Sequence, residues 1–136
     1  MHNNRGMLDK VLSPHSERAY AIMRVVVGLL FSFHGMQKVL GFMVAQPQPV
    51  MSQLWIGGVI ELLTGLMIVA GLFTRWAAFL ASGTMAVAYC QFHWKLQLGA
   101  GLIPTVNKGE LAVVYCFLFL FIACKGAGSW SVDGRR

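Results

Sequence analysis

Apolar residues in this chain are gathered into four long blocks with short polar stretches between them. The blocks lie at about residues 20–42, 54–72, 76–92 and 108–124. A helix needs about 17–25 mostly apolar residues to cross a bilayer, a length that the fourth block reaches only with both of its ends included. Charged residues make up 12% of the chain, about half the share in a soluble domain and too few to cover a globule in water. The sequence therefore predicts an all-α integral membrane four-helix bundle, in one domain over residues 1–136.

Lysine and arginine residues are spread unevenly around these blocks, and their distribution predicts the topology. If the N-terminus lies inside, the outer loops hold only Lys95 and Lys108. The inner segments then hold seven: Arg5, Lys10, Arg18, Arg75, Lys125, Arg135 and Arg136. Because cytoplasmic segments of membrane proteins are enriched in Lys and Arg, this count predicts an N-in, C-in protein. The charges flank apolar blocks and form no continuous basic face, so no nucleic-acid partner is expected.

Several residues mark where the helices begin and end. Gly71 can end the second helix and Thr74 can cap the third, which predicts a tight hairpin between them. Next to this hairpin, a salt bridge from Arg75 to Asp133 would tie the C-terminal tail to it. At the opposite membrane face, Asn107 and Glu110 have the spacing of a capping box at the start of the fourth helix.

The first helix carries ionisable side chains on one face. His34 and Lys38 are four residues apart, and Arg24 and Phe31 fit with them into an arc of roughly 80°. His34 and Lys38 fall in the outer half of the membrane, and Arg24 lies roughly 15 Å nearer the cytoplasm than His34. Ionisable side chains inside membrane helices are costly, so they are candidates for a functional site.

Glu61 lies near the middle of the second helix, at a spacing of four from both Gly57 and Gly65. Small residues at this spacing let a neighbouring helix approach closely, so Glu61 is expected in a helix–helix seam rather than in lipid. A buried carboxylate needs a partner. We therefore expect Glu61 to contact Lys38 or His34.

The antiparallel order of the helices brings two further polar residues to the outer level. The resulting outer-half cluster consists of His34, Lys38, Glu61, His93 and Glu110. Most members also have an ordinary explanation: Lys38 can snorkel to the surface, His93 can lie at the headgroup boundary, and Glu61 can form a purely structural ion pair. A transition metal is an alternative that the spacing disfavours, because no HxxH or ExxH pair gathers ligands on one helix. Bis-His haem, held by His34 and His93 in the outer leaflet, is a further and less favoured alternative. No metal site is predicted.

Four stretches of the chain form a combined pattern, namely Arg24-xxx-Gly28-xx-Phe31-xx-His34-Gly35-xx-Lys38, Gly57-xxx-Glu61-xxx-Gly65, Pro104-xx-Asn107-x-Gly109-Glu110 and Gly126-x-Gly128-x-Trp130-Ser131-x-Asp133. This pattern, over about residues 18–133, resembles the DoxX family of bacterial integral membrane proteins. The resemblance implies a multi-pass protein of the bacterial inner membrane with a link to respiratory, sulfur or oxidative-stress redox chemistry. Some relatives are subunits of a thiosulfate:quinone oxidoreductase and others partner soluble redox enzymes. A redox-protein partner or a homo-oligomer is therefore expected in addition to membrane lipid.

Three hypotheses of function follow. In the first, the chain is a small membrane subunit of a redox system and binds a quinone, with Phe31 and Phe33 packing against the ring. Its catalytic residues, which polarise or protonate the ring oxygens, are then His34, Lys38, Glu61 and Glu110, and its cofactor-binding residues are Arg24, Phe31, His34 and His93. In the second, the chain is a non-catalytic membrane anchor or assembly subunit. In the third, it is a transporter or sensor of a small solute, with the buried charges as its gate. Because the sequence has no flavin or nicotinamide motif, electrons would come from a partner, and whether the chain is an oxidoreductase is left open.

Overall fold

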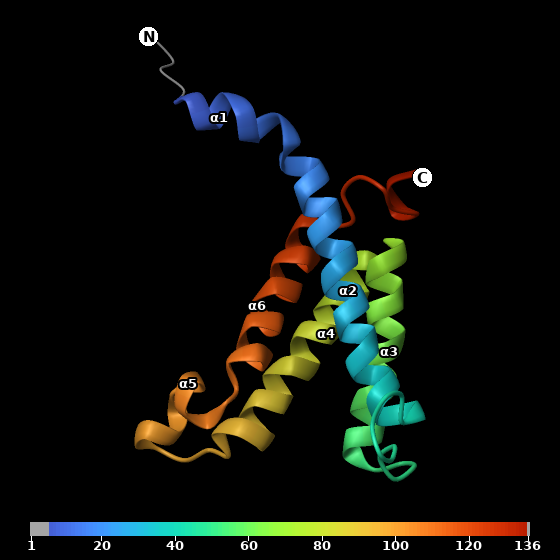
Figure 1. Ribbon diagram of the computed structural model, residues 1–136, viewed down its shortest axis with the longest axis vertical. Helices are drawn as coiled ribbons and strands as arrows, with labels where there is room; N and C mark the ends of the chain where they lie inside the picture. Colours follow the sequence, from blue (N-terminus) through green and yellow to red (C-terminus); the bar gives the residue numbers. More distant parts are fainter. Residues whose placement is uncertain (1–5, 136) are drawn as a thin grey trace.

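The computed structural model describes residues 6–135, which fold into helices without any strand in that range (Figure 1). The long helices are α2 Ser16–Leu40, α3 Gln53–Ala70, α4 Thr74–Ala88 and α6 Glu110–Lys125. The short elements are α1 Met7–Leu12, α5 Pro104–Asn107, a π-helix Tyr89–Trp94, and 3-10 turns at Ser13–His15, Gly99–Leu102 and Asp133–Arg135. Each apolar block thus corresponds to a long helix. The first begins earlier than expected and the last begins later.

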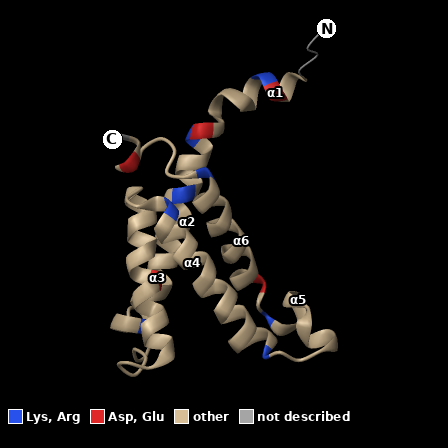
Figure 2. Cartoon of the chain, turned by 180° about the vertical axis from the view of Figure 1, so that it is seen from behind, with Lys and Arg blue, Asp and Glu red and all other residues tan. Residues whose placement is uncertain are grey.

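The long helices pack as two pairs, α2 with α3 and α4 with α6, and α3 also contacts α4. The pairs lie close together at the end of the bundle that holds the base of α1 and the C-terminal segment, which we call the terminal end. They diverge toward the opposite end, which holds the loops 41–52 and 95–109 and which we call the loop end (Figures 1 and 2). Space between helices is therefore expected in the loop-end half.

Glycines allow α2 and α3 to pack closely. A Cβ atom on Gly28 would lie 2.9 Å from the carbonyl oxygen of Gly65, and one on Gly35 would lie 2.6 Å from that of Gly58. Real Cβ atoms do not approach a backbone so closely, so each contact requires a glycine. Gly65 thus lies in the seam as expected. The expectation for Gly57 was wrong, because a Cβ there would meet nothing within 4 Å; the neighbouring residue Gly58 faces α2 instead.

The terminal end is closed by the C-terminal segment. Gly71 ends α3 as expected, with a left-handed φ of 67°. Thr74 is not a cap, because the Asp133 carboxylate accepts hydrogen bonds from its N–H and its hydroxyl, both at 2.9 Å. The salt bridge expected between Arg75 and Asp133 is replaced, since Arg75 donates to carbonyls at the end of α6, including that of Cys124 at 2.5 Å. The tail is therefore tied to the hairpin through the N-terminus of α4.

At the loop end, the π-helix that continues α4 anchors the following loop. The Tyr89 hydroxyl donates to the carbonyl of Leu102 at 2.5 Å and accepts from the Asn107 side chain at 3.1 Å. The expected capping box is absent: Gly109 is the N-cap of α6, and the Asn107 side-chain oxygen accepts from the Gly109 N–H at 2.8 Å. A π turn widens the helix, and such turns are frequent at functional sites.

Large apolar side chains cover the outside of the bundle. Trp76 on α4 and Phe117 on α6, for example, are 75% and 66% exposed. Two helical stretches, Met7–Leu40 and Gln53–Ala70, are long and apolar enough to cross a membrane by length and composition. Extensive exposed apolar surface marks a contact with lipid or with another protein.

Candidate functional site

Two adjacent cavities lie in the loop-end half, where the helix pairs diverge. The first has a volume of about 290 Å³ and is lined by residues of α2, α3, α4, the π-helix and α6, as well as Lys108. Its wall includes five of the residues that the sequence singled out: Phe31, His34, Lys38, Glu61 and His93. The structure thus brings together four members of the outer-half cluster around one space.

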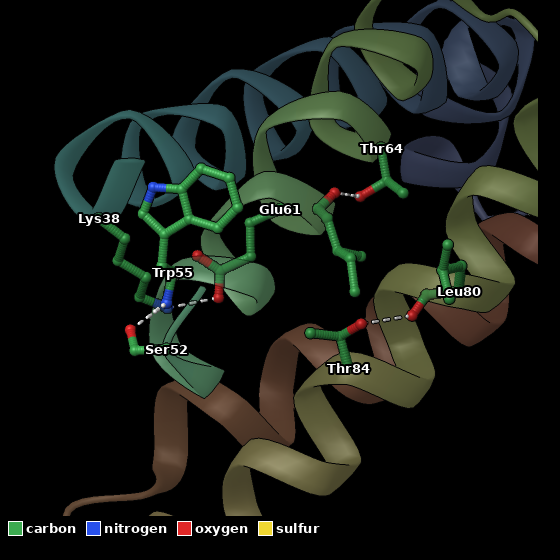
Figure 3. Close-up of polar contacts among 8 residues, drawn as sticks. Lys38, Ser52, Trp55, Glu61, Thr64, Leu80 and Thr84 are labelled. Atoms are coloured by element: carbon green, nitrogen blue, oxygen red, sulfur yellow. Dashed lines mark hydrogen bonds and ion pairs between the residues drawn. The ribbon is translucent and has the colours of Figure 1, made fainter. Parts of the chain in front are cut away.

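Lys38 and Glu61 form the expected ion pair across the seam between α2 and α3 (Figure 3). The Lys38 Nζ lies 2.6 Å from Glu61 Oε1, and the two side chains are 31% and 3% exposed. Gly58 makes room for this pair, because a Cβ there would lie 2.6 Å from that of Lys38. Glu61 Oε2 is buried and accepts no hydrogen bond from the described residues. A buried acceptor without a donor costs free energy, so this oxygen is suited to a donor from a ligand.

Aromatic rings form the wall of the first cavity beside this ion pair. Phe31 packs against Tyr115 and Phe119 at centroid distances of 5.6 and 4.6 Å. The edge of the His34 ring meets Tyr115, with centroids 6.3 Å apart. Among residues 6–135, neither the His34 ring nor the Tyr115 hydroxyl is hydrogen-bonded. Phe33, in contrast, is 44% exposed on the exterior.

Sequence reasoning missed two polar residues of this wall, Tyr115 and Lys108. Tyr115 carries the one hydroxyl within the apolar run 111–124, and this lone polar group was a signal that could have found it. Lys108 was counted only as a loop charge. It follows the short helix α5 with a left-handed φ of 61°, a conformation that sequence pattern alone did not indicate.

His93 lines the first cavity from the π-helix. Its Nδ1 lies 3.3 Å from the carbonyl oxygen of Asn107, and its ring stacks on that of Tyr89 at a centroid distance of 6.5 Å. The ring is therefore held in place by the loop that precedes α6. A histidine that only marked the headgroup boundary would not need to line a cavity, so His93 stays a candidate site residue.

The second cavity has a volume of about 410 Å³ and lies between α3 and α4. It shares five wall residues with the first cavity: Lys38, Leu54, Glu61, Ala88 and Phe92. Most of its remaining wall is apolar. The one hydroxyl there, on Thr84, donates to the carbonyl of Leu80 at 2.9 Å within its own helix (Figure 3). Glu61 thus lines both cavities.

Two predicted site residues lie elsewhere. Arg24 is fully buried at the terminal end. Its guanidinium donates to the carbonyls of Ile68 and Val69 at the end of α3, and to those of Ser129 and Trp130 in the C-terminal segment. Glu110 is the first residue of α6, is exposed, and does not line either cavity. The structure therefore assigns Arg24 a structural position and separates Glu110 from the cluster.

The donor set of the cavities suits an organic ligand rather than a metal ion. Within the described range 6–135, no group of three or more His, Cys, Asp or Glu side chains could hold a metal. The first cavity instead offers a lysine–carboxylate pair, two imidazoles and a phenol beside aromatic rings. These groups can donate and accept hydrogen bonds and exchange protons with a ring that carries oxygen atoms.

Comparisons with known proteins agree with this architecture. The DoxX family model matches residues 19–94, which include α3, α4, the π-helix and most of α2. The chain belongs to the DoxX family. A protein of Haemophilus influenzae described as uncharacterized is 37% identical over 124 residues, an alignment that covers 85% of this chain and 88% of that protein. No solved structure matches the chain significantly. The DoxX assignment and the two long apolar helices identify it as a membrane protein.

Proposed function

We propose that this DoxX protein is a small multi-pass component of a bacterial inner-membrane redox system and that it binds a quinone in the first cavity. The single observation that carries the proposal is Glu61. This carboxylate is 3% exposed, is paired on one oxygen with Lys38, and has a second oxygen to which no described residue donates, on the wall of the cavity. Buried polar groups are nearly always satisfied, so an unsatisfied oxygen on a cavity wall calls for an explanation, and a ligand donor supplies one.

The cavity wall fits the head group of a quinone. Phe31 and Tyr115 are part of this wall and place aromatic surface beside the Lys38–Glu61 pair. A bound quinone supplies two-electron, two-proton chemistry, with the electrons exchanged with a partner redox protein. The Lys38 ammonium can donate a hydrogen bond to a ring oxygen, and His34 can give or take a proton there. Glu61 holds Lys38 in place and gives protons a second site.

The charge distribution supports the N-in, C-in topology. Most Lys and Arg residues lie at the terminal end (Figure 2). Placing this end in the cytoplasm satisfies the positive-inside rule, with all four long helices spanning the membrane.

The topology is tested by cysteine labelling in a variant whose native cysteines Cys90, Cys116 and Cys124 are replaced by alanine. An impermeant thiol reagent should then label Gln46→Cys and Gln97→Cys from outside. It should not label His15→Cys in intact cells, and labelling at His15 would contradict the topology.

Quinone binding by the purified protein tests the proposed function. We expect the wild type to bind a short-tailed benzoquinone in titration calorimetry. Glu61→Gln and His34→Phe should each weaken binding by about tenfold or more, the equivalent of about 1.4 kcal/mol. Ala86→Leu, on the exposed face of α4 and outside both cavities, is the control and should leave the affinity unchanged.

The alternative function is a non-catalytic anchor or assembly subunit. The exposed apolar side chains of the long helices, such as Phe79 and Phe117, favour contacts with lipid or another membrane protein. Absence of quinone binding by the wild type would contradict the quinone site and leave this alternative. If the Glu61→Gln, His34→Phe double variant keeps full function in cells, the quinone site is contradicted in the same way.

A further inference from the structure

Two glycines in the walls of the second cavity have no packing role within the chain. Gly57 on α3 and Gly83 on α4 both line this cavity, and a Cβ on either would meet nothing within 4 Å. A glycine inside a helix costs about 0.5–1 kcal/mol relative to alanine. At Gly58 and Gly65 the close approach of α2 explains the glycine. At Gly57 and Gly83 no neighbouring helix approaches, and both glycines face the second cavity, one from α3 and one from α4.

Glu61 provides an independent observation at the same place. Its side chain lines both cavities, and its buried Oε2 accepts no hydrogen bond from any residue in the described part of the chain. The terminal torsion of a glutamate is soft, so a small rotation can turn this oxygen toward either space. An ionised carboxylate only accepts hydrogen bonds, and its preferred ligand group is therefore a hydroxyl or another donor rather than a carbonyl.

The second cavity connects this acceptor with an apolar surface. Ile56, Ile60, Phe79, Leu80 and Val87 form much of its wall. Phe79 and Leu80 are 62% and 51% exposed, so this wall continues onto the apolar exterior of α4. A hydrocarbon chain that runs through this space exchanges apolar contacts in the bilayer for similar contacts in the protein. The polar head at the inner end of such a chain then lies next to the Glu61 carboxylate.

We propose that the ligand is a hydroxyl-headed lipid, the reduced quinol, whose head hydroxyl donates to Glu61 Oε2 and whose hydrocarbon tail leaves through the second cavity between α3 and α4. This inference rests on the proposed function, because it takes the ligand of the first cavity to be a quinone couple. A helix of a second copy packed on Gly57 and Gly83 is the competing occupant. Such a helix would fill the space with apolar side chains but would supply no donor to Glu61.

The head group is tested by comparing the two redox states of one ligand. Wild-type protein in nanodiscs should bind decyl-dimethoxy-methyl-benzoquinol about tenfold more tightly than the oxidised quinone, measured by calorimetry under anaerobic conditions. Glu61→Gln should narrow this preference, because a neutral amide oxygen accepts the quinol hydroxyl less strongly than a carboxylate does. Equal affinities of the wild type for both redox states would overturn the assignment of the hydroxyl to Glu61.

The tail path is tested by filling the cavity without touching Glu61. Gly83→Leu should weaken binding of the decyl quinol by about tenfold and leave the affinity for the same quinol without a tail unchanged. Ala86→Leu on the same helix is the matched control and should change neither. An unchanged decyl affinity in Gly83→Leu, or an equal loss for both ligands, would overturn the tail path.

The remaining outcomes separate this inference from the proposed function. If the wild type binds neither quinol nor quinone, the proposed function fails and this inference fails with it. In another outcome, the wild type binds quinol and quinone while Gly83→Leu abolishes chemical cross-linking between copies and leaves the affinity for the decyl quinol unchanged. A second copy of the chain then occupies the second cavity. In that case the tail path is overturned while the quinone site stands. The expected result is that Gly83→Leu weakens binding of the tailed quinol only.

Discussion

At the terminal end of the bundle, the buried Arg24 donates hydrogen bonds to four carbonyl groups from α3 and the C-terminal segment. At the loop end, the buried Glu61 has one partner, and its second oxygen has none within residues 6–135. Both residues are charged and almost fully buried. Arg24 belongs to a network that holds the helices together, although its Nε has no partner within residues 6–135, and Glu61 lies beside open space. The comparison teaches that burial and charge alone do not identify a binding residue; the unsatisfied hydrogen-bonding capacity beside a cavity does.

The largest loss of stability is expected at the terminal end. Arg24→Met would remove the donor to four carbonyls, and hydrogen bonds to a charged group contribute about 1.5–3 kcal/mol each. We expect a loss of at least about 3 kcal/mol, measured as thermal unfolding of the purified protein in detergent. Arg24→Lys should recover only part of this loss, since a lysine lacks the planar fork. A smaller effect than for the Glu61 variants would contradict the assignment of Arg24 to the structural end.

The ion pair at the loop end should show coupling of its two members. Lys38→Met and Glu61→Gln are each expected to destabilise the protein, because each leaves a charge uncompensated. Their double variant should lose less than the sum, by about 1–3 kcal/mol, a value kept modest by the partial exposure of Lys38. The same cycle between His34→Phe and Glu61→Gln should be nearly additive, as no hydrogen bond joins these two side chains. If the losses in the Lys38–Glu61 cycle simply add up, the two side chains do not form the ion pair described for the site.

Alanine at two glycines of α3 should have opposite effects. At Gly65 a Cβ would run into the backbone of α2, 2.8 Å from the Gly28 carbonyl oxygen. Gly65→Ala should therefore destabilise by about 1–3 kcal/mol, as overpacking does. Gly57→Ala has free space and should stabilise by about 0.5–1 kcal/mol by reducing backbone entropy. Thermal unfolding of both variants measures the difference, and equal effects would argue against the seam as described.

The smallest effect is expected where the C-terminal segment meets α4. Asp133 accepts hydrogen bonds from the N–H groups of Phe73 and Thr74 at 3.0 and 2.9 Å. Asp133→Ala should cost about 1 kcal/mol, the usual value for a lost helix cap. Asp133→Asn keeps an accepting oxygen and should lose clearly less. If the two variants unfold at the same temperature, the carboxylate does not act as the cap of α4.

Sequence reasoning predicted the elements that depend on local pattern. Long apolar runs form helices because a membrane helix satisfies its own backbone hydrogen bonds, and each of the expected blocks became a long helix. Helical periodicity and the need of a buried charge for a partner also predicted a contact of Glu61 with Lys38 or His34, and the structure shows Lys38. Gly71 ends α3 because a left-handed residue there favours glycine. These features need only the properties of neighbouring residues along one helix.

Only the tertiary structure decided which face, and which end, each residue occupies. The glycine in the seam is Gly58 rather than Gly57, since the turn of α3 relative to α2 is fixed by packing and one residue rotates the face by about 100°. Arg24 shares a helix face with His34, yet the end of α3 and the C-terminal segment each give it two carbonyl partners. Tyr115 and Lys108 reach the first cavity because the helix pairs diverge at the loop end. Divergence of packed pairs is a property of the whole bundle, and no local pattern encodes it.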